Sequence, residues 1–225
     1  MAGYDAVLFD LDGTLCRRTQ DTAALFEAAF ERVGVERFAE PSALWAALDG
    51  PPDPDDQVGY LGAGFARLAA QHGRRVDPLA LAAAFVEGVD NRQVAFGPGA
   101  RDALDAANAT GETGLVTNGP ASRQAEKVRA LGLDAELDTV VYAGDLARRK
   151  PHAEPFERAL SELDAAPEET LYVGDSLDYD VAGAHTAGLP VVWCRHDPET
   201  EPAPYRPDHV VDSLTELAEL LGERA

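Results

Sequence analysis

The sequence contains, close to its start, Val7-Leu8-Phe9-Asp10-Leu11-Asp12-Gly13-Thr14-Leu15, an apolar run that ends in two aspartates one residue apart. The apolar residues predict a buried strand. Because strand residues i and i+2 share a face, Asp10 and Asp12 can both face the crevice at the carboxyl edge of a sheet, and Gly13 lets the chain turn away. Two carboxylates so close repel each other unless a cation lies between them or one holds a proton. The segment therefore predicts a strand that brings two acids to a functional site; a plain acidic turn is the alternative.

Short apolar runs like this one recur along the chain and alternate with helical patterns, several of which end at a glycine. Near-continuous apolar strands that alternate with helices are typical of a parallel sheet covered on both faces. We therefore expect a doubly wound, Rossmann-like α/β fold. The predicted strands are Ala6–Phe9, Gly114–Thr117, Thr139–Ala143, Leu171–Val173, Val191–Cys194 and Val210–Val211, and the predicted helices lie near residues 100–109, 121–131, 154–164, 178–187 and 214–221.

The interval from about residue 17 to residue 94 breaks this alternation. It contains helical patterns near 21–33, 41–48, 58–72 and 78–90, and no convincing strand. We interpret it as an all-helical domain inserted after the first strand. The predicted domains are a core formed by residues 1–16 and 95–225, and a helical insertion formed by residues 17–94.

The composition is strongly acidic. The 225 residues include 19 Lys+Arg and 40 Asp+Glu, which gives a formal net charge of −21, while 45% hydrophobic residues indicate a chain that folds. So acidic a protein repels phosphate backbones and anionic lipids, which argues against nucleic acid and membranes as partners. No apolar stretch approaches the roughly 20 residues of a transmembrane helix, and the acidic start is unlike a signal peptide. We therefore expect a cytoplasmic protein.

Lysine is nearly absent: Lys127 and Lys150 are the only two, and the other seventeen cations are arginines. An acidic excess with so little lysine is expected of a halophilic protein, because a Debye length of about 3 Å at 1 M salt screens the self-repulsion. A high-GC genome that favours arginine and alanine codons is the alternative explanation.

Polar residues also follow three later strands. The second predicted strand ends at Thr117-Asn118, Lys150-Pro151 lies in the loop after the third, and the fourth is followed by Gly174-Asp175-Ser176-Leu177-Asp178-Tyr179-Asp180. Oxygen-rich carboxylate sites suit Mg²⁺, and a lysine and a hydroxyl beside them suit a phosphoryl group. The strand ends together predict a site for magnesium-assisted phosphoryl chemistry.

These segments, DLDGT, VTN, KP and GDSLDYD, resemble in order and spacing the four motifs of the haloacid dehalogenase superfamily of phosphohydrolases. The resemblance covers essentially the whole chain. The helical insertion between the first two motifs is similar to the C1 cap of the phosphoglycolate phosphatase and β-phosphoglucomutase-like branch. The resemblance is specific for the superfamily and says little about the substrate.

The resemblance implies three catalytic residues. Asp10 is expected to attack phosphorus and form an aspartyl-phosphate. Asp12 is expected to protonate the leaving oxygen and later to deprotonate the hydrolytic water. Lys150 is expected to pair with Asp10 and with the phosphoryl oxygens.

The resemblance also implies binding residues. Thr117, with Asn118 beside it, is expected to bind the phosphoryl group together with Lys150. Asp180 fits the second acidic position of the last motif and is expected to act through a water or a hydrogen bond. The expected magnesium ligands are Asp10, Asp12 through its backbone carbonyl, Asp175 and Asp180.

Two family activities are disfavoured by individual residues. Dehalogenases that resemble this pattern lack an acid at the position of Asp12, and residues 17–94 contain no lysine that could form a Schiff base in a phosphonatase. We therefore expect a Mg²⁺-dependent phosphatase that acts on a small phosphorylated metabolite. A phosphomutase of sugar phosphates and a non-catalytic binding protein on the same scaffold are the alternatives.

Overall fold

The structure is a computed structural model that describes residues 4–49 and 56–222. The chain divides into two compact units. Thr19–Gln93 form a helical unit, and the segments up to Arg18 and from Val94 onward form a sheet unit.

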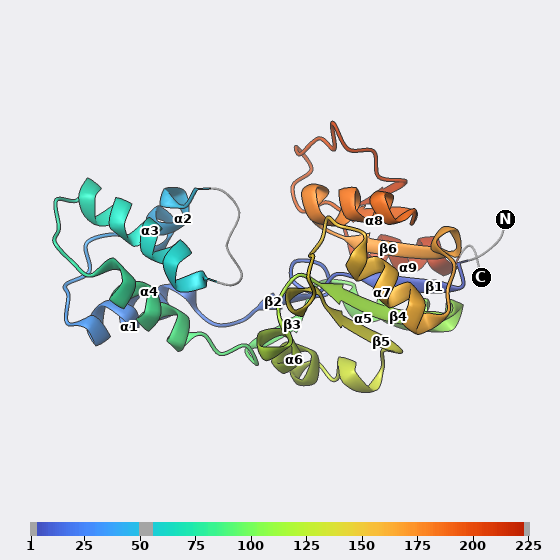
Figure 1. Cartoon of the computed structure of the whole chain (residues 1–225), viewed down its shortest axis with the longest axis horizontal. Coiled ribbons are helices and arrows are strands. Elements are labelled where there is room, and N and C mark those ends of the chain that lie inside the picture. The colour runs from blue at the N-terminus through green and yellow to red at the C-terminus, as the bar shows by residue number, and fades with distance from the viewer. Residues whose placement is uncertain (1–3, 50–55, 223–225) are drawn as a thin grey trace. The chain divides into compact units, whose positions relative to one another are not determined.

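The sheet unit is built on six strands that all pair in parallel, in the order β5-β4-β1-β6-β7-β8 (Figure 1). The predicted doubly wound parallel sheet is therefore confirmed. The central strand β1 lies between β4 and β6. The strands are β1 (Ala6–Phe9), β4 (Glu112–Thr117), β5 (Thr139–Tyr142), β6 (Thr170–Gly174), β7 (Val191–Cys194) and β8 (His209–Val211).

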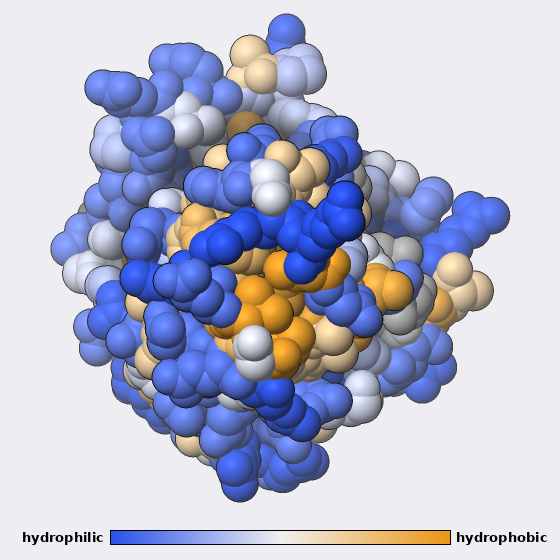
Figure 2. Space-filling view, turned by 90° about the vertical axis from the view of Figure 1, so that its left-hand side faces the viewer, coloured by the Kyte–Doolittle hydropathy of each residue, from blue (hydrophilic) through white to orange (hydrophobic). Residues whose placement is uncertain are grey.

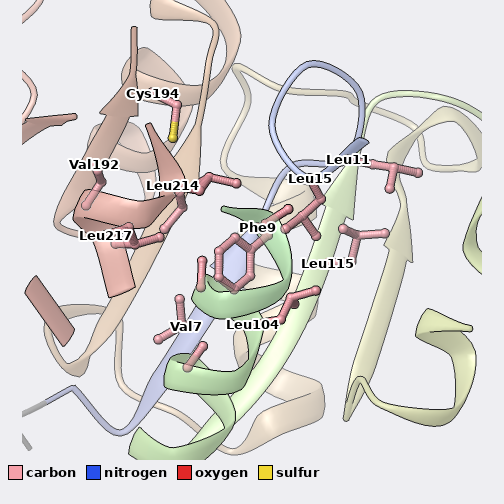
Figure 3. Close-up of a cluster of buried hydrophobic side chains, with 14 of the residues drawn as sticks. Val7, Phe9, Leu11, Leu15, Leu104, Leu115, Val192, Cys194, Leu214 and Leu217 are labelled. Atoms are coloured by element: carbon pink, nitrogen blue, oxygen red, sulfur yellow. The ribbon is translucent and has the colours of Figure 1, made fainter. Parts of the chain in front are cut away.

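Helices cover both faces of this sheet because β1 is apolar on both sides. Val7 and Phe9 pack in one core cluster (Figure 3) with side chains of the helices α5 (Ala100–Thr110), α6 (Ala121–Ala130) and α9 (Leu214–Gly222). Ala6 and Leu8 pack in a second cluster with side chains of α7 (Glu154–Leu163) and α8 (Ala182–Ala187). The alternation of residues along a strand therefore anchors β1 between two separate cores.

The order of the strands determines at which edge of the sheet a ligand can bind. From β1 the sheet continues through β4 and β5 on one side and through β6, β7 and β8 on the other. Such a switch point leaves a crevice at the carboxyl ends of the central strands, where ligands bind in open α/β sheets. The loops after β1, β4 and β6 therefore meet at one place.

A two-stranded antiparallel ribbon corrects one expectation. β2 (Cys16–Arg18) pairs with β3 (Val94–Phe96), so strands occupy both ends of the interval for which the sequence predicts none. Arg17 faces Ala95 in this ribbon, and both arginines of β2 are exposed. Strands of three residues are too short to show an alternating pattern, which explains why the sequence does not reveal them.

The helical unit consists of α1 (Thr22–Val33), α2 (Pro41–Ala47), α3 (Gln57–Gln71) and α4 (Pro78–Gly88). Asp21, Asp56 and Asp77 cap three of these helices by accepting hydrogen bonds from backbone N–H groups of the first turn. The core of the unit is aromatic, with the rings of Phe26 and Phe65 stacked at 5.8 Å between centroids. The described residues of the unit contain helices and no strand, as predicted.

One face of the molecule shows how polar and apolar residues are distributed on the surface. Figure 2 shows a face that is mostly hydrophilic, with an apolar patch within it. Among the described residues of the helical unit, Trp45 and Leu79 are large apolar side chains that remain exposed. None of the helices in the described part of the chain is both long and apolar enough to span a membrane.

Candidate active site

The loop after β1 lies directly against the loop after β6. Gly13 has a φ of +92°, and a Cβ atom added to it would come within 2.6 Å of Asp175 Oδ2. Only glycine accepts both this backbone conformation and so close a neighbour. Next to it, the Thr14 hydroxyl donates a hydrogen bond to Asp175 Oδ1 at 3.2 Å. The Asp-Gly-Thr sequence thus brings acids from two strand ends together.

Three carboxylates gather at this point. Asp10, Asp175 and Asp180 each offer an oxygen atom, and these atoms all lie within 4.8 Å of one another. Asp10 and Asp180 are buried, and the backbone N–H of Ser176 donates to Asp180 Oδ2 at 2.9 Å. Gly174 provides the necessary space, since a Cβ atom at this position would lie 2.4 Å from the Asp180 carboxyl carbon.

Lys150 is the cation at the centre of the cluster. Its Nζ donates to Asp10 Oδ1 at 2.6 Å and to Asp180 Oδ1 at 2.7 Å. The Val116 carbonyl and the Tyr172 hydroxyl also lie within hydrogen-bond distance of Nζ, at 2.9 Å and 2.8 Å, so four acceptors share its three hydrogens. The Tyr172 hydroxyl donates to Asp180 Oδ1 at 2.9 Å. The lysine therefore holds two of the three acids in fixed positions.

One lysine does not balance three carboxylates. Burial raises the pKa of Asp10 to about 8, because the Asp180 and Asp175 charges reinforce the burial and Lys150 offsets them only in part. Burial and the Asp180 charge also raise the pKa of Asp175. The pKa of Lys150 is raised because Asp10 and Asp180 outweigh the effect of its burial. The cluster is therefore deficient in positive charge.

The donor set fits a hard divalent cation. It consists of carboxylate oxygens alone, which Mg²⁺ prefers, and a bound cation would relieve their repulsion. Asp180 already accepts from Lys150, Tyr172 and Ser176, so it is suited to orient its neighbours through hydrogen bonds. Asp10 and Asp175 are the side chains best placed to hold the ion. The expected contact of the Asp12 carbonyl with the metal stays a prediction.

The Asp12 carboxylate is not part of this cluster and has partners of its own. Lys127 Nζ donates to its Oδ1 at 2.7 Å and to its Oδ2 at 2.6 Å, and Gln124 Nε2 donates to Oδ2 at 2.8 Å. Burial acts to raise the pKa of Asp12, but the charge and hydrogen bonds of Lys127, with the bond from Gln124, hold it below its ordinary value. Lys127 and Gln124 therefore stabilise the carboxylate form of Asp12.

Thr117 and Asn118 lie at the end of β4, between these two groups. The Thr117 hydroxyl accepts a hydrogen bond from Gln124 Nε2 at 2.6 Å. The Asn118 side chain accepts from the backbone N–H of Lys150 at 2.9 Å and donates to its carbonyl at 3.1 Å. Asn118 therefore fixes the backbone of Lys150. The expected roles of both residues in substrate binding stay predictions.

The sequence analysis does not identify four side chains at this edge: Gln124, Lys127, Tyr172 and Trp193. Trp193 Nε1 donates to the Asp175 carbonyl at 2.8 Å and so holds the loop after β6. A signal for Gln124 and Lys127 does exist. They stand three residues apart on α6, on the helix face that carries the buried Val128, where an amphipathic pattern calls for apolar residues.

A family model described as a haloacid dehalogenase-like hydrolase matches residues 4–188. The chain belongs to this family. It is 29% identical over 228 residues to the pyrimidine 5′-nucleotidase YjjG of Escherichia coli, covering 97% of this chain and 98% of that protein. It is 32% identical over 229 residues to a phosphoglycolate phosphatase of Cupriavidus necator, covering 96% of this chain and 92% of that protein. The resemblance found in the four motifs is therefore confirmed.

The fold of the haloacid dehalogenase-like hydrolases is also evident from a solved structure. The chain superposes on YfnB of Bacillus subtilis, bound to magnesium, with a TM-score of 0.75 and 24% identity, covering 97% of this chain and 99% of that chain. At this identity the likeness speaks for the fold. The family model and the named phosphatase relative confirm the prediction of a phosphatase enzyme.

Proposed function

We propose that this haloacid dehalogenase-like hydrolase is a Mg²⁺-dependent phosphatase that cleaves a small phosphorylated metabolite through an aspartyl-phosphate. The observation that carries the proposal is the buried cluster in which Lys150 bonds both Asp10 and Asp180 while Asp175 stands beside them. This arrangement presents a positioned carboxylate and a cation at a site that needs a second cation. Phosphoryl transfer depends mostly on such positioning and charge stabilisation.

The residues divide the chemistry between two steps. Asp12 takes up a proton from solvent as the ester binds; Asp10 attacks phosphorus, the bond to the leaving oxygen breaks, and Asp12 gives that oxygen the proton. Asp12 then takes a proton from a water whose oxygen bonds to phosphorus, which releases phosphate and restores Asp10. Lys150 and the Thr117 hydroxyl bind the phosphoryl oxygens in both steps. Bound Mg²⁺ would supply charge neutralisation between Asp10 and the phosphoryl group.

The relatives support the substrate class. One is named as a nucleotidase and another as a phosphoglycolate phosphatase, both names of enzymes for small phosphate esters. We infer that the helical unit, Thr19–Gln93, acts as a cap that selects the leaving group and excludes water. Nucleic acid and membranes fit poorly with the net charge of −21, and we expect the enzyme to work in a salt-rich cytoplasm.

A screen of phosphorylated metabolites tests this function. The protein is incubated with nucleotides, sugar phosphates and phosphoglycolate, with Mg²⁺ or EDTA, in dilute buffer and in molar KCl. We expect phosphate release that requires Mg²⁺ and is faster in molar KCl, and a loss of roughly 10⁴-fold in kcat for Asp10→Asn, which lacks the nucleophile.

Asp178→Asn is the matched control, because Asp178 is an exposed aspartate of the loop after β6 and bonds Tyr205. It should keep full activity. Equal rates for Asp10→Asn and the parent would refute the nucleophile. Isomerised sugar phosphate without phosphate release would favour a phosphomutase, and tight binding with no turnover of any ester would favour the binding protein.

A further inference from the structure

Helix α6 turns two buried polar side chains toward the catalytic edge. Gln124 and Lys127 are 4% and 3% exposed, respectively, and stand three residues apart, so they share one face of the helix. Nothing in the four motifs includes α6. A buried ammonium group is costly unless it is paired, so the position of Lys127 requires an explanation.

The partner of Lys127 is exposed to a very different degree. The Lys127 side chain is 4% exposed, whereas the Asp12 side chain that it bonds is 45% exposed. An ion pair that serves only to stabilise a core buries both members. Here a buried cation supports a carboxylate that remains open to the site. Lys127 therefore contacts the carboxylate from its buried side and leaves the other side accessible for reaction.

We propose that Lys127 and Gln124 are positioning residues, which hold the Asp12 carboxylate in the orientation for proton transfer and direct the Thr117 hydroxyl toward the phosphoryl group. This inference rests on the proposed phosphatase function. The contacts that carry it are the two bonds from Lys127 to Asp12 and the bridge that Gln124 makes between Asp12 and Thr117.

Lys127 bonds Asp12 through both carboxylate oxygens. A carboxylate bonded to one cation through Oδ1 and Oδ2 cannot rotate freely. Oδ2 accepts from both Lys127 and Gln124, whereas, among the described residues, the second lone pair of Oδ1 is approached only by the Cys16 thiol, at 3.9 Å, so Oδ1 is the oxygen that can exchange a proton. Asp12 gives a proton to the leaving oxygen as the P–O bond breaks and takes one from water as the new P–O bond forms. Lys127 neither gives nor takes a proton; it stabilises the carboxylate after each release.

The contact with Thr117 orients a donor. Gln124 Nε2 donates to the Thr117 oxygen, which engages that oxygen as an acceptor. Its hydroxyl hydrogen is then available to a phosphoryl oxygen. A single amide thus couples the acid–base residue to the phosphoryl-binding residue.

Two aryl phosphates that differ in leaving group test the inference. 4-Nitrophenolate leaves without a proton, whereas phenolate requires more help from a general acid. We expect Lys127→Met to lower kcat/KM for phenyl phosphate by about 10²-fold and that for 4-nitrophenyl phosphate by less than about fivefold. Because Asp12 also activates the water, the variant should release a burst of 4-nitrophenol equal to the enzyme concentration before a slow steady state. Lys127→Arg should restore part of the phenyl phosphate rate.

Arg129→Met is the matched control, since Arg129 is an exposed cation on the same helix. It should leave both rates unchanged. In an Asp12→Asn background, Lys127→Met should cause no further loss, because Lys127 acts through Asp12. Gln124→Leu serves if Lys127→Met does not fold, and should show a weaker form of the same leaving-group selectivity.

The outcomes separate this inference from the function on which it rests. A parent enzyme that, with Mg²⁺, hydrolyses neither these two esters nor any metabolite of the screen overturns the phosphatase function, and the role of Lys127 with it. If the parent hydrolyses both esters, three results overturn the role of Lys127 alone. These are no loss of rate in Lys127→Met, an equal loss for the two esters, and a loss that adds to that of Asp12→Asn.

Discussion

The two lysines of this chain lie at the same edge of the sheet in contrasting surroundings. Lys150 bonds Asp10 and Asp180 and stands in a cluster that includes Asp175, so one cationic side chain serves three carboxyl groups. Lys127 bonds the carboxylate of Asp12, and this pair is neutral. The first group is incomplete without a further cation, and the second is complete in itself. The edge therefore separates the place where a phosphoryl group and a metal bind from the place where protons move.

The largest effects on stability and activity are expected when either lysine is removed, and the two removals should differ. Lys150→Met leaves Asp10 and Asp180 buried without a cation, and we expect a loss of about 3–5 kcal/mol in the free energy of unfolding. The same variant should lose about 10²–10³-fold in kcat. Lys127→Met should lose only about 1–2 kcal/mol, since the Asp12 side chain stays 45% exposed and can be hydrated. Denaturant unfolding in constant KCl measures both, and equal losses would contradict the comparison.

Asp175→Asn tests the excess of negative charge. Replacing one of three mutually repelling carboxylates by a neutral amide should raise the metal-free free energy of unfolding by about 1 kcal/mol. The same change should abolish most of the stabilisation by Mg²⁺, because a metal ligand is lost. Thermal unfolding with EDTA or MgCl₂ measures both effects, with Asp178→Asn as control. A less stable metal-free variant would show that the cluster is not short of positive charge.

The smallest expected effects concern the pH dependence of stability. Asp10, the partner of Lys150, and Asp12, the partner of Lys127, should contribute to it with opposite signs. The pKa of Asp10 is raised from 3.8 to about 8, so the metal-free folded state holds a proton that the unfolded state releases, and stability falls as pH rises between these values. The pKa of Asp12 is lowered, so its contribution is present above the ordinary value and is lost as pH falls below it.

Magnesium should therefore raise the melting temperature by a few degrees more at pH 8.5 than at pH 5.5, where a proton competes with the ion for Asp10. Scanning calorimetry at both pH values, at one ionic strength, measures the difference. A magnesium effect that is equal at the two pH values would contradict the raised pKa of Asp10.

Much of the fold can be predicted because each element carries its own local signal. The apolar run before Asp10 predicts β1 at its observed bounds, and the alternation with helices predicts the parallel sheet. The order of the strands has no such signal, since it depends on which apolar runs pair. β2 and β3 are missed because pairing across a long insertion, and not local pattern, makes Arg17 and Ala95 neighbours.

The residues of the candidate site also differ in how far the sequence predicts them. Lys150 is recognisable because it stands in a motif next to Pro151, and the structure places it among the expected acids. Lys127 stands in no motif, and its only signal in the sequence is its position on the helix face that carries Val128. Only the packing of α6 against the sheet turns this residue inward, to within 2.6 Å of an Asp12 oxygen that lies 115 positions away in the chain.

The burial of both lysines has a consequence for the chemistry of the protein's surface. Each lysine is 3% exposed, and every other cationic side chain apart from histidine is an arginine. A reagent that acylates side-chain amines therefore finds its targets only at the catalytic edge. Acylation of the lysine side chains, counted apart from that of the α-amino group, reports how often that edge opens, and we expect it to inactivate the enzyme. The rate of lysine acylation therefore measures local opening at the active site.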